Sequence, residues 1–211
     1  MTTRFIVVRH GETQWNVERR VQGWGDSPLT ATGLAQADAI GKRLARERFD
    51  ALVASDLPRA FETARRIAAH CALPVTADAR LRERSFGVGE GMGYAEIDRA
   101  YPEVFSRERE TTNPDLVMPG GESRRQFHER IRVAFEGLAR EHDGRRVAVV
   151  THGGVLAALY RIVHGIPVAH AHRVAISNAS YNAVAFDADA WVLEAWDETD
   201  HLPGGVPFVE S

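Results

Sequence analysis

The sequence predicts an α/β fold in three layers: a mostly parallel central sheet flanked by helices, with a helical or loop excursion over one edge of the sheet. Short apolar runs rich in β-branched residues, typical of strands buried on both faces, recur along the chain. Stretches in which apolar residues follow helical spacing separate these runs. This alternation favours a parallel sheet whose connecting helices cover both faces.

In the first half of the chain, expected strands and helices take turns. The strands are continuous apolar runs, whereas the helices have charged residues between their apolar positions. A threonine can cap the first helix, and a proline suits the first turn of the second. Expected in order are a strand at 5–8, a helix from Thr30 or Thr32 to about Arg48, a strand at 51–54, a helix from Pro58 to about Ala69 and a short strand at 74–76.

The second half repeats the alternation after an irregular stretch. Residues 82–93 are rich in glycine and charge, which is typical of a working loop, and residues 94–123 form the expected excursion. We find no repeat or linker, so we expect residues 1–211 to form one domain. Expected after the excursion are a long helix to about His142, a strand at 146–150, a helix to about His164, and strands at 173–176, 181–186 and 191–196, with a turn at 187–190.

The composition indicates an ordinary globular protein. Of the 211 residues, 44% are hydrophobic and 26% are charged, and the net charge of −3 argues against a general nucleic-acid or anionic-membrane surface. A single cysteine excludes an intrachain disulfide. No apolar run approaches the roughly 18 residues of a membrane span, and the first residues lack the apolar core of a signal peptide, so we expect a cytoplasmic protein.

Two of the expected strands end in the same way. His10 follows the strand at 5–8, His152 follows the strand at 146–150, and a glycine comes after each histidine. Ligands of open α/β sheets bind outside the carboxyl ends of the strands, so the two histidines are expected to share one site. Arg59, near the start of the helix that follows the strand at 51–54, is expected at the same edge, where helix N-termini favour anions.

Two histidines with Arg9 and Arg59 describe a pocket for a dianionic group. Arginine offers paired donors that match phosphate oxygens, and a neutral imidazole is a competent nucleophile toward phosphorus. We expect the two arginines to lower the pKa of His10 and so keep it unprotonated. Glu83, in the irregular loop, is the best candidate to give a proton to the departing oxygen, although Glu90 lies in the same loop.

These motifs, in this order, resemble the histidine phosphatase superfamily, in its phosphoglycerate mutase-like branch. The resemblance implies that His10 carries the phosphoryl group through a covalent intermediate and that Glu83 is its proton donor. It also implies that neither a cofactor nor a metal takes part. The motifs are Arg9-His10-Gly11-Glu12-Thr13, Asn16, Ser55-Asp56 with Arg59-Ala60, Glu83, and Thr151-His152-Gly153-Gly154. Phosphoryl contacts are implied for Arg9, Arg59, His152 and Asn16, while Gln22, Gly23 and Gly153 are expected to border the substrate.

Three functions fit this pattern. The leading hypothesis is a phosphomonoester hydrolase acting on a small phosphorylated metabolite; the first alternative is a phosphoglycerate mutase, and the second is a non-catalytic protein that binds phosphorylated ligands. The intact set of reactive residues argues against the last. Compared with the mutases, the excursion is short and the chain ends soon after Phe208, which favours hydrolysis, whereas the pair Glu83-Arg84 is mutase-like.

Other residues allow an ordinary explanation. Asp56 is expected to cap the helix that holds Arg59. The set His164, His170 and His172 lacks a carboxylate or cysteine that would complete a metal site, so we expect no metal there. Trp24 is close enough in sequence to the site to line its entrance. The apolar terminal strands can either finish the sheet or pair with a second copy, which leaves a homodimer open.

Overall fold

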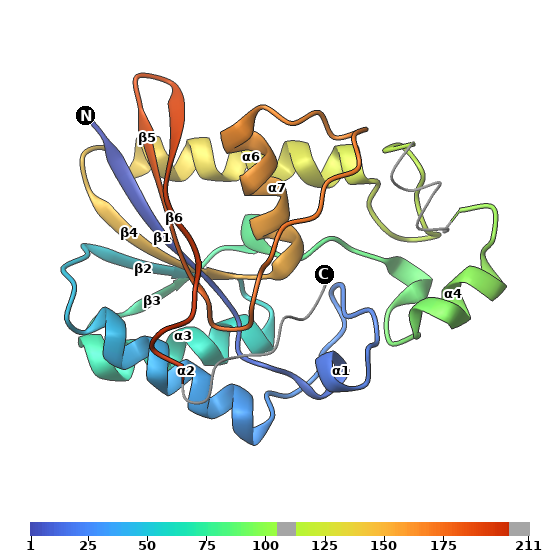
Figure 1. Cartoon of the computed structure of the whole chain (residues 1–211), viewed down its shortest axis with the longest axis horizontal. Coiled ribbons are helices and arrows are strands. Elements are labelled where there is room, and N and C mark those ends of the chain that lie inside the picture. Colours follow the sequence, from blue (N-terminus) through green and yellow to red (C-terminus); the bar gives the residue numbers. More distant parts are fainter. Residues whose placement is uncertain (105–112, 203–211) are drawn as a thin grey trace.

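A six-stranded sheet forms the centre of the protein in a computed structural model, which describes residues 1–104 and 113–202 (Figure 1). The strand order is β3-β2-β4-β1-β5-β6, and the first four of these strands are parallel, while β5 and β6 are antiparallel to their neighbours. The prediction of a mostly parallel α/β fold is therefore confirmed. The strands are β1 (Thr3–Arg9), β2 (Ala51–Ala54), β3 (Val75–Ala77), β4 (Arg146–Thr151), β5 (Tyr181–Asp187) and β6 (Ala190–Glu198).

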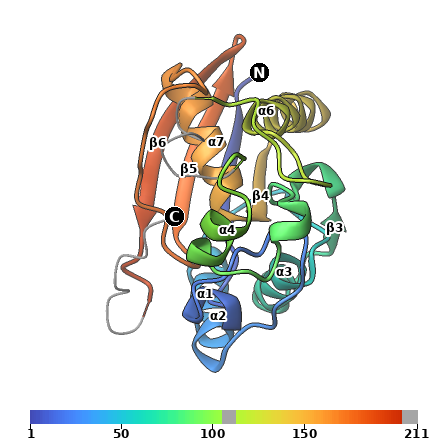
Figure 2. The same cartoon turned by 90° about the vertical axis from the view of Figure 1, so that its right-hand side faces the viewer.

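Helices cover both faces of this sheet, as Figures 1 and 2 show: α2 and α3 lie on one face, and α6 and α7 lie on the other. The short helices α1 and α4 lie apart from these layers. The bounds are α1 (Gln14–Val17), α2 (Ala31–Leu44), α3 (Pro58–Cys71), α4 (Tyr94–Ala100), α6 (Arg124–Glu141) and α7 (Gly153–His164), with 3₁₀ turns at Ala79–Leu81 and Gly87–Gly89.

Strand β1 shows why the sheet needs cover on both sides. Its side chains alternate between two cores: Phe5 and Val7 pack with residues of α6 and α7, whereas Ile6 and Val8 pack with residues of α2 and α3. All four are almost completely buried. A continuous apolar run is therefore the pattern that this central strand requires.

A side chain caps the start of α1, α2 and α6, whereas the cap residues of α3, α4 and α7 make no side-chain hydrogen bond to the helix. Thr30 caps α2 by accepting the N–H of Gly33, and the helix ends at Leu44, before the expected Arg48. The prediction that Asp56 caps α3 is wrong, because Leu57 holds the cap position without a side-chain hydrogen bond. Asp56 instead forms a two-point ion pair with Arg82, with N···O distances of 2.7 and 2.5 Å.

The expected strand at 173–176 is not formed. This segment is irregular. Two of its backbone carbonyls accept hydrogen bonds from side chains instead of from a neighbouring strand: Trp196 Nε1 donates to Ala175 O, and Arg9 Nη1 donates to Ile176 O. Its β-like composition is thus overridden by tertiary contacts. The expected turn at 187–190 is a tight hairpin between β5 and β6, with Ala188 and Asp189 both at positive φ.

The expected helical or loop excursion at 94–123 contains the helix α4, whose bounds the irregular sequence did not predict, and part of the excursion, 105–112, lies outside the described residues. The long helix α6 begins where the excursion ends, at a capping box formed by Ser123 and Gln126. Among the helices of the described chain, none is long and apolar enough to span a bilayer.

Candidate active site

The ends of β1 and β4 bring two histidines together. These strands are parallel neighbours with Arg9 opposite Thr151, and the N–H of His10 donates to Thr151 O at 2.9 Å. The rings of His10 and His152 therefore meet edge-on, with centroids 5.3 Å apart. Both histidines thus lie at one edge of the sheet, where the sequence placed them.

The His10 ring has a defined tautomer. Its Nδ1 lies 2.8 Å from the carbonyl oxygen of Gly11, and because a carbonyl can only accept, Nδ1 carries the proton of the neutral ring. The lone pair is then on Nε2. A neutral imidazole held in this way presents a nucleophilic nitrogen.

Both histidines are neutral in this environment. Burial, followed by the positive charges of Arg59 and Arg9, holds the pKa of His10 well below its ordinary value. For His152, burial is again the largest cause of a lowered pKa, and Arg59, His10 and Arg9 add to it. The predicted direction for His10 is confirmed, although burial contributes more than the two arginines.

The two arginines are buried donors. Arg59 is 2% exposed, and its Nη1 and Nη2 donate to the carbonyls of Gly25 and Gly23 at 2.9 and 2.7 Å, which fixes the loop that precedes α2. Burial lowers the pKa of Arg59 to about 10, so it stays cationic at neutral pH. Arg9 donates through Nη1 to Ile176 O at 2.6 Å.

Three buried nitrogens of these residues have no hydrogen-bond partner among the described residues: Arg9 Nε, Arg59 Nε and His152 Nδ1. Unpaired buried polar atoms are costly, and three of them on residues gathered at one edge of the sheet fit a site whose ligand supplies the missing partners. Two of the three are cationic donors. The group that satisfies such a set is an anion with several acceptor oxygens, such as a phosphoryl group.

Glu83, not Glu90, holds its carboxylate at this site. Its Oε2 accepts the N–H of Gly154 at 2.9 Å, and its charge acts on both Arg9 and Arg59. Glu90 has a different task, because its Oε1 accepts from the backbone N–H groups of Trp24 and Phe86 and so joins two loops. The structure thus assigns different positions to Glu83 and Glu90, two carboxylates of one loop between which the sequence alone could not choose firmly.

The remaining predicted residues surround this centre. Asn16 Oδ1 accepts the backbone N–H of Thr13 at 3.0 Å, and the Thr13 hydroxyl lies 3.0 Å from both Asn16 Oδ1 and Gln22 Oε1, to one of which it donates its single proton. Gly23 lies on the loop that Arg59 fixes. At Gly153, an added Cβ would lie 3.4 Å from Arg9 Nε, so this glycine packs directly on the guanidinium.

Comparison with known protein families shows to which family this chain is related. The histidine phosphatase superfamily (branch 1) matches residues 5–199 of this chain. The chain belongs to this superfamily. The resemblance inferred from the ordered motifs is therefore confirmed, and with it the assignment of the chain as an enzyme of this type.

Relatives of this histidine phosphatase carry names of two kinds. A metal-independent phosphoserine phosphatase of Arabidopsis thaliana is 41% identical, over 95% of this chain and 83% of that protein. A probable phosphoglycerate mutase GpmB of Salmonella choleraesuis is 36% identical, over 90% of this chain and 88% of that protein.

Solved structures share the fold. Bacillus stearothermophilus YhfR superposes with a TM-score of 0.86 and 34% identity, over 95% of this chain and 99% of that chain. A mycobacterial glucosyl-3-phosphoglycerate phosphatase superposes with a TM-score of 0.80 and 31% identity, over 93% and 99%.

Two elements of this histidine phosphatase site were missed by the sequence analysis. The first is Asn178, in the irregular segment before β5, whose Nδ2 donates to the carbonyl of His10 at 2.9 Å and lies 3.5 Å from Asn16 Oδ1. The run of small, mostly polar residues at 177–180 is buried, which is unusual for such residues. That polar run between two apolar strands was the available signal.

The second missed element is a clasp from α6 on the loop that carries Glu83. Arg130 donates to the carbonyls of Arg80, Arg82 and Glu83, at 2.7, 2.9 and 3.1 Å, and pairs with both oxygens of Glu122. Although burial acts to raise it, the pKa of Glu122 is held below its ordinary value by hydrogen bonds from Arg130 and from the N–H of Ser85. The clasp by Arg130 therefore fixes the backbone of the loop that carries the Glu83 carboxylate.

Trp24 lies on the same loop from the other side. Its indole Nε1 donates to Glu83 O at 2.7 Å, and the guanidinium of Arg82 lies over its ring. The ring remains 41% exposed. Trp24 therefore borders the Glu83 segment, as expected for a residue at the entrance.

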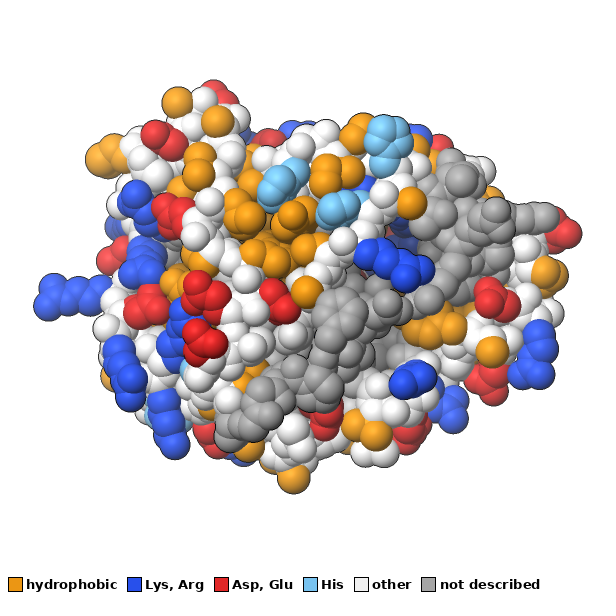
Figure 3. Space-filling view, in the orientation of Figure 1, with side chains coloured by type: hydrophobic (Ala, Val, Ile, Leu, Met, Phe, Trp, Pro, Cys, Tyr) orange, Lys and Arg blue, Asp and Glu red, His pale blue; other side chains and the backbone are white. Residues whose placement is uncertain are grey.

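The histidines at and after the end of α7 have a structural explanation. His164 and His172 both stack on the ring of Tyr160, with centroids 4.1 and 5.2 Å away, and Trp196 meets the same ring edge-on. Figure 3 shows histidines beside hydrophobic side chains on this face. In the described parts of the chain, no three His, Cys, Asp or Glu side chains gather into a possible metal site.

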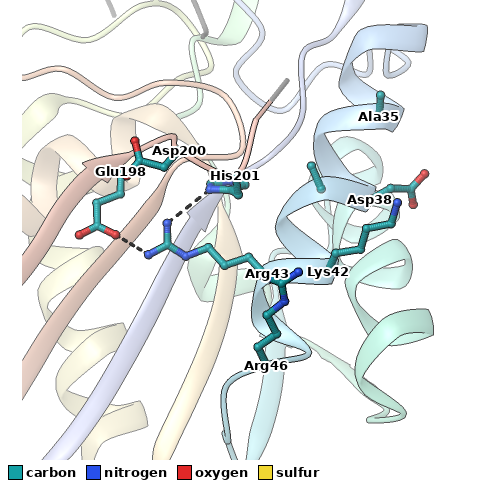
Figure 4. Close-up of a pocket in the computed structure, with 9 residues that line it drawn as sticks. Ala35, Asp38, Lys42, Arg43, Arg46, Glu198, Asp200 and His201 are labelled. Atoms are coloured by element: carbon teal, nitrogen blue, oxygen red, sulfur yellow. Dashed lines mark hydrogen bonds and ion pairs between the residues drawn. The ribbon is translucent and has the colours of Figure 1, made fainter. Parts of the chain in front are cut away.

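A separate groove lies between α2 and the segment after β6, away from both histidines of the strand ends (Figure 4). Its central cation, Arg43, forms an ion pair with Glu198 and lies 3.4 Å from Nδ1 of His201. Among the described residues, none of the buried nitrogens that lack a hydrogen-bond partner belongs to a residue lining this groove, which distinguishes it from the strand-end site.

Proposed function

We propose that this histidine phosphatase is a phosphomonoester hydrolase that acts on a small phosphorylated metabolite through a phosphohistidine on His10. The observation that carries the proposal is the pairing of a neutral His10, with its lone pair on Nε2, with three buried and unpartnered nitrogens on Arg9, Arg59 and His152. A nucleophile and a set of donors for equatorial oxygens are the two requirements of phosphoryl transfer.

In the first half-reaction, Nε2 of His10 attacks phosphorus and the ester P–O bond breaks. The positive charges of Arg9 and Arg59 stabilise the negative charge that spreads over the phosphoryl oxygens. Glu83 gives its proton to the departing oxygen, which leaves as an alcohol. The hydrogen bond between Oε2 and the N–H of Gly154 holds the carboxyl group in place for this transfer.

In the second half-reaction, a water molecule attacks the phosphohistidine. Glu83, now ionised, takes a proton from this water, and the P–N bond to His10 breaks. Inorganic phosphate forms, and the neutral imidazole and the protonated carboxyl group are restored. The same two residues thus serve both steps.

The names of relatives support hydrolysis, because both a phosphoserine phosphatase and a glucosyl-3-phosphoglycerate phosphatase are similar over nearly the whole chain. Those substrates share a phosphomonoester on a small polar molecule that carries a carboxylate. A mutase is the second candidate, favoured by the similarity to GpmB proteins and by the pair Glu83-Arg84. A mutase would return the phosphoryl group to a second hydroxyl rather than to water.

The deciding experiment is phosphorus NMR of the purified protein with excess chelator, 3-phosphoglycerate and a trace of 2,3-bisphosphoglycerate. A panel of other phosphomonoesters, including phosphoserine, is followed in parallel. We expect inorganic phosphate to accumulate with at least one ester, and to be absent in His10→Ala. Appearance of 2-phosphoglycerate with the same dependence on His10 would identify a mutase. Turnover by His10→Ala at the wild-type rate would contradict both.

A further inference from the structure

Ser55 lies directly beside His152, at the ends of two neighbouring strands. It follows β2, which pairs with β4 so that Ala54 is opposite Val150, and its Oγ lies 2.8 Å from Nε2 of His152. Both side chains are completely buried. The hydrogen bond therefore involves one ring nitrogen of His152, while the other, Nδ1, is the buried atom without a partner among the described residues.

The direction of this hydrogen bond follows from counting protons. A serine hydroxyl carries one proton, and Ser55 Oγ already accepts the N–H of Leu57 at 3.3 Å. If His152 donated from Nε2, the Ser55 proton would have no acceptor in the described structure, and Nδ1 would be a lone pair without a donor. If Ser55 donates, only the N–H at Nδ1 lacks a partner. Leaving fewer buried groups unpaired is favoured.

We propose that Ser55 is a positioning residue that fixes the tautomer of His152: its hydroxyl donates to Nε2, which places the ring proton on Nδ1 and makes that nitrogen a donor to the phosphoryl oxygens. The inference rests on the proposed function for the identity of the ligand, but not for the tautomer itself.

The proposal gives the neighbouring rings of His10 and His152 the same tautomer but different roles. In His10 the N–H at Nδ1 donates to Gly11 O, so the lone pair of Nε2 is available to attack phosphorus. In His152 the lone pair on Nε2 accepts the hydroxyl proton of Ser55, so the N–H at Nδ1 is available to donate to a phosphoryl oxygen. One ring attacks and the other donates. A His152 lone pair turned toward a phosphate dianion would instead repel it.

Removing the hydroxyl tests this assignment. In Ser55→Ala, Nε2 of His152 loses its donor, and the ring can place its proton on either nitrogen. We expect the affinity for inorganic phosphate to fall about tenfold, the loss of roughly one hydrogen bond to a charged group. Ser55→Thr keeps the hydroxyl and should restore most of the affinity. Ser180→Ala removes another fully buried hydroxyl that contacts no histidine, and serves as the matched control.

The decisive measurement is the tautomer itself, read by long-range proton–nitrogen NMR of the ¹⁵N-histidine-labelled protein without ligand at pH 7.5. The His10→Gln and His152→Gln variants assign the signals. We expect Nδ1 of His152 to be protonated and Nε2 to be unprotonated in the wild type and in Ser180→Ala. Ser55→Ala should shift the ring toward protonation of Nε2.

Each other result overturns the proposal. A wild-type His152 with its proton on Nε2, or on both nitrogens, would show that Ser55 accepts rather than donates. An Nδ1 tautomer unchanged in Ser55→Ala would show that Ser55 does not fix it. Because the spectra need neither substrate nor turnover, they are independent of whether the protein releases phosphate. The test does not depend on Ser55→Thr, because the tautomer is read from the wild-type and Ser55→Ala spectra once the two His→Gln variants have assigned the signals.

Discussion

In the proposed mechanism the carboxyl group of Glu83 gives a proton to the departing oxygen, which an amide of the same shape cannot do. In Glu83→Gln the amide oxygen can still accept the N–H of Gly154, whereas the N–H of Arg84 loses the acceptor that Oε1 provides. The loop should keep its position because Arg130 holds its backbone carbonyls. We predict that kcat for an alkyl phosphate falls by about 10²–10⁴, the usual contribution of general acid catalysis. With p-nitrophenyl phosphate, whose leaving group needs no proton, the loss should be much smaller. Equal losses for both esters would argue against Glu83 as the acid.

The backbone at Gly154 leaves no room for a side chain. A Cβ there would lie 2.1 Å from Oε1 of Glu83, well inside contact distance, and the carboxylate would have to move. We predict that Gly154→Ala lowers kcat for an alkyl phosphate by about 10²-fold, because a misplacement of about 1 Å is enough for such a loss. Steady-state kinetics measures it. Gly137→Ala, on α6 against the flexible end of Arg80, is the control and should keep wild-type kinetics.

At the scale of elements, helix α6 holds the catalytic loop through Arg130. Lysine in its place keeps the charge but loses the planar set of donors that reaches three carbonyls and Glu122. We predict that Arg130→Lys lowers kcat about tenfold or more while the affinity for inorganic phosphate stays near the wild-type value, since Glu83 moves and the phosphoryl-binding residues do not. Arg132→Lys, which changes an arginine paired with Glu129 and Glu136 on the same helix, is the control.

The opposite pattern would be informative. If Arg130→Lys weakened phosphate binding and left kcat unchanged, the clasp would position the anion site rather than the acid. An effect of Arg132→Lys as large as that of Arg130→Lys would indicate a general loss of helix stability.

Elements with strong periodicity were predictable from the sequence, because a continuous apolar strand or a long amphipathic helix leaves few alternatives. The segment at 173–176 was not, since Trp196 and Arg9 take up its carbonyls and no local pattern reveals such distant partners. The short helices α1 and α4 have too few turns to show a period. Asp56 failed as a cap for a similar reason: Arg82 competes for it from another loop.

Some residues of the candidate site could likewise be predicted from the local sequence, whereas others depend on contacts between distant segments. His10 and His152 could be placed together because the carboxyl ends of parallel strands meet at one edge, whatever else the fold does. Ser55, Asn178 and Arg130 contact the site through hydrogen bonds between residues far apart in sequence. The choice between Glu83 and Glu90 also depended on such contacts.

At the scale of the whole molecule, keeping buried histidines neutral makes folding depend on pH. The pKa values of His10 and His152 are well below the ordinary value of about 6.5, which the unfolded chain retains. Below pH 6.5 the unfolded state therefore binds more protons than the folded state, and stability falls as pH falls. Above pH 6.5 both states are neutral at these sites, and their contribution is fully present.

We predict that each of these two histidines removes up to about 2 kcal/mol from the free energy of unfolding between pH 6.5 and pH 5, at about 1.4 kcal/mol per pH unit. Urea unfolding at pH 7.5 and pH 5 measures the loss. The double variant His10→Gln and His152→Gln should lose clearly less stability over this interval than the wild type, because its two buried amides do not titrate. His170→Gln changes an exposed histidine and should match the wild type. If the double variant lost as much stability as the wild type, the acid sensitivity would arise outside the active site.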